Sequence, residues 1–145
     1  MRISARTQYA LRATAELAAA QLASAPSGPV SAERIASSQD IPRRFLDNIL
    51  LQLRRAGLIE SQRGPDGGYW LARPATEITL ADIILVIEGV PSHSERFPGV
   101  AEPLAEVWTA LRTFENATLT EITLAHIASG SLPPLSSPPL SAPPH

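Results

Sequence analysis

The sequence predicts a mainly α-helical protein with one small β-hairpin, arranged as a winged helix-turn-helix that is followed by a long helix. Three observations support this fold class. Residues 30–57 carry start and stop signals for two short helices separated by a tight turn. Two short strand candidates follow, on either side of a glycine-rich tip. A later segment repeats apolar residues near every 3.5 positions, which is typical of helices that pair.

The first helix is predicted over residues 4–25. Ser4 can cap its N-terminus. The apolar stripe of this helix consists of Tyr9, Ala10, Ala13, Leu17 and Leu22, and its many alanines allow close packing. We expect it to support the two helices that follow the Pro- and Gly-containing loop at residues 25–29.

The helix pair is predicted from its caps and periodicity. Ser31 caps the first member, residues 39–41 break the pattern, and Pro42 opens the second. The second helix places apolar residues at helical spacing, namely Phe45, Leu46, Ile49, Leu50 and Leu53. Its opposite face is polar and contains Arg43, Arg44, Asp47, Asn48, Gln52 and Arg55. We expect Gly57 to end the helix, and the polar face to enter the major groove of DNA.

The hairpin, or wing, is predicted from strand candidates at residues 58–63 and 69–73. The tip between them, Gly-Pro-Asp-Gly-Gly, has the conformational freedom that a chain reversal needs. Gly67 and Gly68 lack side chains, so the backbone there is expected to approach a phosphate closely.

Charge is distributed unevenly along the 145 residues. Residues 1–73 hold ten arginines and six acidic residues, whereas residues 74–145 hold two arginines and eight acidic residues. The basic half coincides with the predicted helix pair, although the whole chain has a net charge of −2. This distribution favours binding of the first half to nucleic acid.

The second half is predicted to connect and dimerise. Thr79 caps a short helix that ends at Gly89, and residues 90–102 form a loop. Pro103 then opens a long helix whose seam suits a second copy of the chain: Leu104, Val107, Trp108, Leu111 and Phe114. Residues 121–128 nearly repeat residues 77–84, and we interpret both as Thr-capped helix starts.

These elements predict three units. Residues 1–75 form the winged helix-turn-helix, residues 76–128 form the connecting and dimerisation helices, and residues 129–145 form a disordered tail with six prolines and five serines. The tail is either a solvated extension or a ligand for a proline-recognising partner.

Several function classes are disfavoured by the sequence. The chain has no cysteine, which excludes disulfides, thiolate metal sites and cysteine nucleophiles. Phosphate-loop and nucleophile-elbow motifs are missing and the three histidines are scattered, so we do not expect an enzyme. No run approaches the roughly 20 apolar residues that span a bilayer, and the N-terminus lacks the apolar core of a signal peptide. A cytoplasmic protein without membrane contact is expected.

Residues of several segments together resemble the Rrf2 family of bacterial transcription regulators. The most specific of these are Leu-Arg-Arg-Ala-Gly-Leu at 53–58 and Arg-Gly-Pro-Asp-Gly-Gly-Tyr at 63–69. Shorter matches are Tyr-Ala-Leu-Arg at 9–12, Gly-Pro-Val-Ser at 28–31, Ile-Ala at 35–36, Phe-Leu at 45–46, Ile-Ile at 83–84 and Glu-Gly at 88–89. The resemblance covers about residues 1–128.

The resemblance implies a homodimer that is joined through the long helix, binds a palindromic operator in double-stranded DNA and represses transcription. It places Arg44, Asp47 and Asn48 against bases or phosphates and Arg63 in the minor groove. Arg44 can bind guanine and Asn48 adenine, and Asp47 can accept from cytosine. Phosphate contact or simple solvation is the alternative for Arg44 and Asn48, whereas Asp47 is more ambiguous because a carboxylate repels phosphate.

One departure from the family concerns its iron–sulfur cluster. Many members carry three cysteines in the loop before the dimerisation helix, whereas this chain has none, and Gln8 stands where some members supply an acidic ligand. We therefore expect no cofactor and no metal. His93 with Glu95 and Glu102 could form part of a metal site, but a lone exposed histidine is the simpler interpretation.

Two questions stay open at this stage. Trp108 and Phe114 could line the site of an unknown small-molecule effector, or they could be ordinary core residues. The winged helix could also bind a protein instead of DNA, which the acidic second half and the proline-rich tail would favour.

Overall fold

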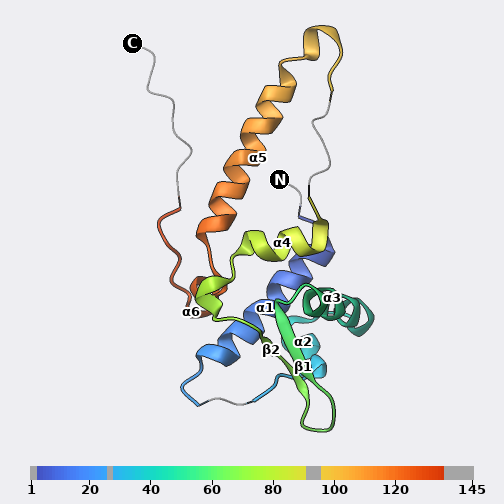
Figure 1. The fold of residues 1–145 in the computed structure, drawn as a ribbon, viewed down its shortest axis with the longest axis vertical. Helices are drawn as coiled ribbons and strands as arrows, with labels where there is room; N and C mark the ends of the chain where they lie inside the picture. The colour runs from blue at the N-terminus through green and yellow to red at the C-terminus, as the bar shows by residue number, and fades with distance from the viewer. Residues whose placement is uncertain (1–2, 26–27, 91–95, 136–145) are drawn as a thin grey trace.

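The structure is a computed structural model that describes residues 3–25, 28–90 and 96–135. His93, Glu95 and the part of the predicted tail from residue 136 onwards lie outside the described residues. The elements in chain order are α1 (Ala5–Leu22), α2 (Ala32–Gln39), α3 (Arg43–Arg55), β1 (Ile59–Gln62), β2 (Gly68–Leu71), η1 (Ala75–Glu77), α4 (Leu80–Glu88), η2 (Gly99–Ala101), α5 (Leu104–Glu121) and α6 (Leu124–Ser129). Figure 1 shows a body of short elements around α1, from which α5 extends. The predicted fold class, mainly α with a β-hairpin and a long C-terminal helix, is confirmed.

Helix α1 lies at the centre of the body. Ser4 caps it by accepting a hydrogen bond from the Thr7 N–H at 3.1 Å. Its small side chains Ala10, Ala13 and Ala18 are fully buried, and α2, α3, α4, α6 and β2 all contact this helix. The alanines therefore allow the neighbouring elements to approach α1 closely. The helix ends at Leu22, earlier than the predicted residue 25.

Helices α2 and α3 form the predicted pair. Ser31 caps α2, and Asp40 adopts the left-handed conformation (φ 51°) that turns the chain toward α3. Pro42 is the N-cap of α3, one residue before the helix begins. Four side chains of α3 are buried in the core: Leu46, Ile49, Leu50 and Leu53.

The end of α3 is a Schellman motif. Gly57 has φ +80° and donates to the Arg54 carbonyl at 3.0 Å, while the Leu58 N–H donates to the Leu53 carbonyl at 3.1 Å. Gly57 thus ends the helix as predicted, although the capping residue itself is Ala56.

Phe45 is a correction to the predicted apolar face of α3. Its side chain is 44% exposed and packs beside Tyr9, with 6.3 Å between the ring centroids. Position 45 lies at the margin of the apolar face. Helical periodicity alone could not show that a ring of α1 covers this side chain only in part.

The hairpin pairs β1 with β2 in antiparallel register, with Ile59 opposite Leu71 and Gln62 opposite Gly68. Val30 adds a short bridge to its edge, through hydrogen bonds of 2.9 and 2.8 Å with Tyr69. Both strands are shorter than predicted, because pairing stops where the chain enters the tip and where it turns into η1.

Gly67 and Gly68 have a structural reason to be glycine. A Cβ atom at Gly67 would collide with the Gln62 carbonyl oxygen, and one at Gly68 would collide with the backbone of Val30. Both residues therefore permit close approach within the protein, a role that the sequence did not predict. Their contact with a phosphate stays a prediction.

The two near-identical segments, 77–84 and 121–128, lie side by side. The Leu80 N–H donates to the Ile122 carbonyl and the Leu124 N–H to the Ile78 carbonyl, each at 2.9 Å. Thr79 and Thr123 begin α4 and α6 in the predicted way, and each forms a capping box. The two copies of the segment thus hold the start of α4 against the start of α6.

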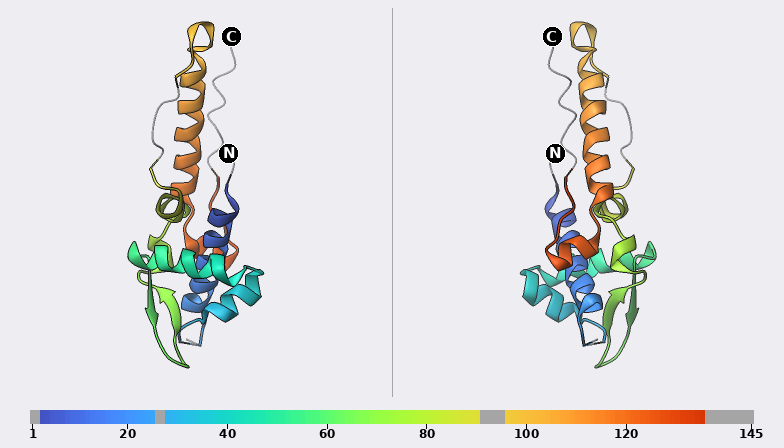
Figure 2. Two further views of the ribbon diagram at one scale, coloured as in Figure 1. Left: turned by 90° about the vertical axis from the view of Figure 1, so that its right-hand side faces the viewer. Right: turned by 90° about the vertical axis from the view of Figure 1, so that its left-hand side faces the viewer.

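Helix α5 buries no residue in the described structure. Its seam is open to solvent: Leu104 is 42% exposed, Val107 49%, Trp108 40% and Leu111 47%, while Phe114 is half-buried. Figure 2 shows α5 standing clear of the helix-turn-helix in two further views. The interpretation of Trp108 as a core residue is therefore wrong for a single subunit, whereas Phe114 is half-buried and its interpretation stays a prediction. Among the described residues, only α4 packs appreciably against this helix.

The predicted loop at residues 90–102 contains a short 3-10 turn, η2, before α5. Ser129, the expected first residue of the tail, is the last residue of α6, and Gly130 caps that helix. No helix among the described residues combines the length and apolar character that a membrane crossing requires.

Candidate nucleic-acid interface

An open groove of about 590 Å³ separates α3 from the hairpin. Its walls come from the start of α2, the outer face of α3 and the tip-proximal part of the wing. Five of the predicted DNA-binding residues line it: Arg43, Asp47, Arg63, Gly67 and Gly68. The fold therefore brings the outer face of α3 and the wing together, as the prediction requires.

Arg43 and Asp47 form an exposed ion pair at one wall of this groove. The guanidinium and carboxylate are 3.3 Å apart, one helical turn along α3. Such a pair adds well under about 1 kcal/mol to stability, so either partner can exchange it for a contact with DNA. The pairing also offsets the negative charge of Asp47, which would otherwise repel phosphates.

Arg63 and Arg54 frame the wing side of the groove. Arg54 at the end of α3 donates to the Ser61 hydroxyl at 3.2 Å, which ties the helix to β1. Arg63 follows β1 directly and is exposed. An exposed arginine at this place is available for a narrow minor groove, where the negative potential is enhanced.

Arg44 and Asn48 line a separate hollow of about 300 Å³, together with Arg6 and Phe45. The Arg44 guanidinium carbon is 5.0 Å from the centre of the Phe45 ring, and the Arg12 carbon is 5.2 Å from that of Tyr9. Together with the Tyr9–Phe45 contact, these pairs form a row in which two rings lie between two cations. The row restrains Arg44 beside the exposed face of α3.

Sequence reasoning missed Arg6 as a member of this surface. Its guanidinium donates to Asn48 Oδ1 at 2.6 Å and also to Gln52 Oε1. Arg6 belongs to α1, and 42 residues separate it from Asn48. No local pattern could have joined them, since the contact depends on how the N-terminal end of α1 crosses α3.

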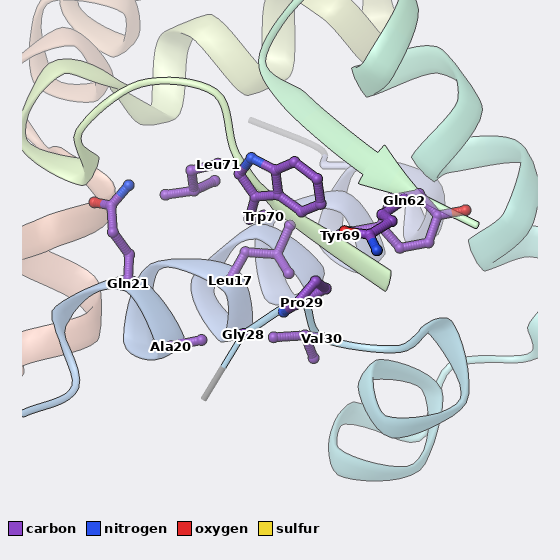
Figure 3. A pocket seen from close by; sticks show the side chains of 10 residues that line it. All are labelled: Leu17, Ala20, Gln21, Gly28, Pro29, Val30, Gln62, Tyr69, Trp70 and Leu71. Carbon is purple, nitrogen blue, oxygen red and sulfur yellow. The ribbon is translucent and has the colours of Figure 1, made fainter. Parts of the chain in front are cut away.

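A separate apolar pocket of about 440 Å³ lies behind the wing, between α1 and β2. Figure 3 shows Leu17, Trp70 and Leu71 around it, with Gln21 at one side. Gln21 also holds the chain after β2, because it donates to the Arg73 carbonyl at 3.0 Å and accepts from the Ala75 N–H. The position of the wing is thereby fixed against α1.

The described residues do not fit an iron–sulfur cluster or a metal ion. The chain lacks the cysteine thiolates that hold such clusters, and the described part contains no group of three or more His, Asp or Glu side chains arranged for a metal. His126 is engaged in the capping box of Thr123, and Gln8 hydrogen bonds to the Ile3 carbonyl at 3.3 Å. We therefore assign no function to a cluster in this chain.

The fold and the groove define a winged helix-turn-helix DNA-binding protein. Residues 3–130 match the Rrf2 family model, which is described as an iron-dependent transcriptional regulator, and the chain belongs to this family. It is accordingly a helix-turn-helix transcriptional regulator and not an enzyme.

Relatives of known sequence and structure agree with this assignment. A protein of Mycobacterium tuberculosis named as the helix-turn-helix transcriptional regulator Rv1287 is 44% identical, over 86% of this chain and 80% of that protein. The structure of CymR, the global cysteine regulator of Bacillus subtilis, is similar with a TM-score of 0.76 and 34% identity, covering 90% of this chain and 98% of that one. T. potens IscR gives a TM-score of 0.73 at 31% identity, covering 90% and 88%.

Proposed function

We propose that this regulator is a homodimer that binds a palindromic operator and represses transcription in the cytoplasm. The observation that carries the proposal is the combination of a groove between α3 and the wing, which three arginines and two acidic residues line, with an exposed apolar seam on α5. Two copies joined by α5 present two grooves related by a two-fold axis, which suits a palindrome. A dimer seated on a promoter blocks access to it.

Dimerisation is proposed from the exposed seam. Leu104, Val107, Trp108 and Leu111 recur at the spacing of paired helices, and all four face solvent in the single subunit. Contiguous exposed apolar surface of this kind marks an interaction site in a soluble protein. A second copy offers the same seam, so the contact is self-complementary.

DNA recognition is proposed for the polar face of α3 and for the wing. Arg44 and Asn48 lie one turn apart, so one stretch of major groove can receive both side chains. Arg43, Asp47 and Arg63 line the adjoining groove. An exposed arginine at the base of the wing suits insertion into a narrow minor groove. Each good base contact contributes about 1–3 kcal/mol of discrimination.

We further propose that the protein works without an iron–sulfur cluster, since the thiolates that such a cluster needs are missing from the sequence. A small-molecule effector stays a prediction. Its expected walls, Trp108 and Phe114, lie on helix α5, which buries no residue within the described part of one subunit. A thermal-shift screen of the full chain against small molecules, in the presence of operator DNA, would test for it.

The test of the proposal is selection of DNA from a random duplex pool by the full chain, with Arg44→Ala and Arg63→Ala beside it. The expected result is a palindromic motif that the wild type enriches and that both variants lose or degrade. Affinity for this motif should fall steeply as salt increases, because phosphate contacts release counterions.

The competing function, a winged helix that binds a protein, predicts a different outcome. The acidic second half and the proline-rich tail favour this alternative. If it holds, a partner protein remains bound after nuclease treatment, and no duplex is enriched. That result would overturn the DNA-binding proposal.

A further inference from the structure

We propose that Arg6 determines the base specificity of Asn48. By holding the side-chain oxygen of Asn48, Arg6 makes the amide nitrogen face the DNA, so that Asn48 selects an acceptor edge such as guanine O6 and N7 and does not pair with adenine. This inference rests on the proposed DNA contact of α3 and adds a residue from α1 to the recognition surface.

The first step is the contact itself. One terminal nitrogen of Arg6 donates to Asn48 Oδ1 at 2.6 Å and to Gln52 Oε1. Asn48 and Gln52 are one turn apart on α3, so a single guanidinium spans both carboxamides. Hydrogen bonds from a charged donor are stronger than those between neutral groups, so this exposed contact favours one orientation of both side chains.

The second step is the direction in which each carboxamide must point. An arginine side chain only donates hydrogen bonds, so whatever carboxamide meets it must turn its oxygen toward it. The donor chemistry of arginine alone therefore determines which end of the carboxamide faces it. For Asn48, the amide nitrogen is then directed away from Arg6.

The third step is that Gln52 fixes the arrangement to the body of the protein. Its oxygen accepts from Arg6, and its amide nitrogen donates to the Val86 carbonyl of α4 at 3.3 Å. Gln52 is therefore satisfied at both ends and cannot turn over without losing two hydrogen bonds. Arg6 is held by a side chain that is itself anchored.

The fourth step concerns what Asn48 offers to a ligand. Asn48 is exposed, and its amide nitrogen has no hydrogen-bond partner among residues 3–25, 28–90 and 96–135. Adenine is recognised by an asparagine that donates to N7 and accepts from N6 at once. Because Oδ1 already accepts from Arg6, the amide nitrogen is the group of Asn48 left without a partner within the described residues, and it can donate as lysine and arginine side chains do to guanine O6 and N7.

The test is selection from a random duplex pool by the full chain and its variants. Asn48→Ala first identifies the position in the motif at which Asn48 acts. At that position the wild type should prefer guanine, or thymine through its O4 acceptor, over adenine by about 5- to 150-fold. Arg6→Met should shift the preference toward adenine, because the carboxamide can then turn and pair with both groups of that base.

Two further variants separate specificity from folding or phosphate binding. Arg6→Lys should keep the wild-type base, since lysine also only donates, whereas Arg6→Gln should lose it, since glutamine can accept. Arg73→Met, an exposed arginine after β2, serves as the matched loss of charge and should leave the motif unchanged.

The outcomes are distinct. A motif that keeps the same base at the Asn48 position in all the Arg6 variants, with affinity lowered equally for every sequence, would make Arg6 a phosphate contact and overturn the inference alone. A wild-type preference for adenine at that position would also overturn it. If the wild type enriches no motif at all, both this inference and the proposed function fail.

Discussion

Helices α3 and α5 carry similar apolar periodicity but have different surroundings. In the 13 residues of α3, four apolar side chains are buried against α1 and neighbouring elements, whereas the 18 residues of α5 bury none. The contrast shows that a periodic stripe predicts which face of a helix will be covered. It does not say whether the cover comes from the same chain or from a second copy.

The largest effect is expected from a cavity in the buried stripe. Leu50→Ala should lower the free energy of unfolding by about 2–5 kcal/mol, because Leu50 is fully buried in α3 and its removal leaves a hole. Chemical denaturation of the full chain measures this loss, which should be the same at all protein concentrations. Leu51→Ala, at a half-buried position of the same helix, is the control and should cost clearly less. Equal losses would show that α3 is not the buried helix described here.

The second effect concerns the exposed stripe. Leu111→Asp places a charge in the proposed seam and should weaken dimerisation by about 2 kcal/mol or more, the loss typical of a central interface side chain. Sedimentation velocity over a range of concentrations measures the change, and far-UV circular dichroism should show that the subunit still folds. Glu106→Asp, an exposed substitution on the same helix, is the control. An unchanged dimer in Leu111→Asp would place the interface elsewhere.

The third effect separates DNA contact from assembly. Arg44→Ala should weaken binding to the selected operator by about 1–3 kcal/mol while leaving the oligomeric state intact, because Arg44 lies on the outer face of α3. Fluorescence anisotropy with a labelled duplex gives the affinity. Arg73→Ala, outside that face, should change it little. Equal weakening by the two substitutions would show that Arg44 contributes only its positive charge and makes no specific contact.

The smallest effect is expected at a helix cap. Ser31→Ala removes the acceptor for the Arg34 N–H and should destabilise the protein by about 1 kcal/mol. Thermal unfolding detects this change, and Ser31→Asp should restore most of the stability because aspartate also caps helices. A loss in Ser31→Asp as large as that in Ser31→Ala would show that the hydroxyl acts otherwise than as a cap.

Much of the fold could be predicted because its signals are local. Ser4, Ser31, Thr79 and Thr123 all cap the helices that the sequence assigned to them. Gly57 ends α3, and the glycine-rich tip joins two short strands. Each signal acts within about four residues of the element that it starts or stops, so one sequence is enough to find it.

The misses share a different cause, since each depends on residues distant in the chain. Phe45 is only partly covered, by the ring of Tyr9 from α1, and Gly68 is a glycine because the backbone of Val30 lies against it. Trp108 lacks a cover within the subunit, and Arg6 meets Asn48 only after α1 and α3 have packed. Periodicity and caps carry no information on such long-range contacts.

The central claim, that α5 needs a second copy whereas α3 is complete within one chain, is tested most directly by the mass of the full chain in solution. Light scattering coupled to size exclusion should give twice the 15.5 kDa of one chain for the wild type and the mass of a single chain for Leu111→Asp. A wild-type mass of one chain at every concentration, in a protein that still binds its operator, would contradict the account.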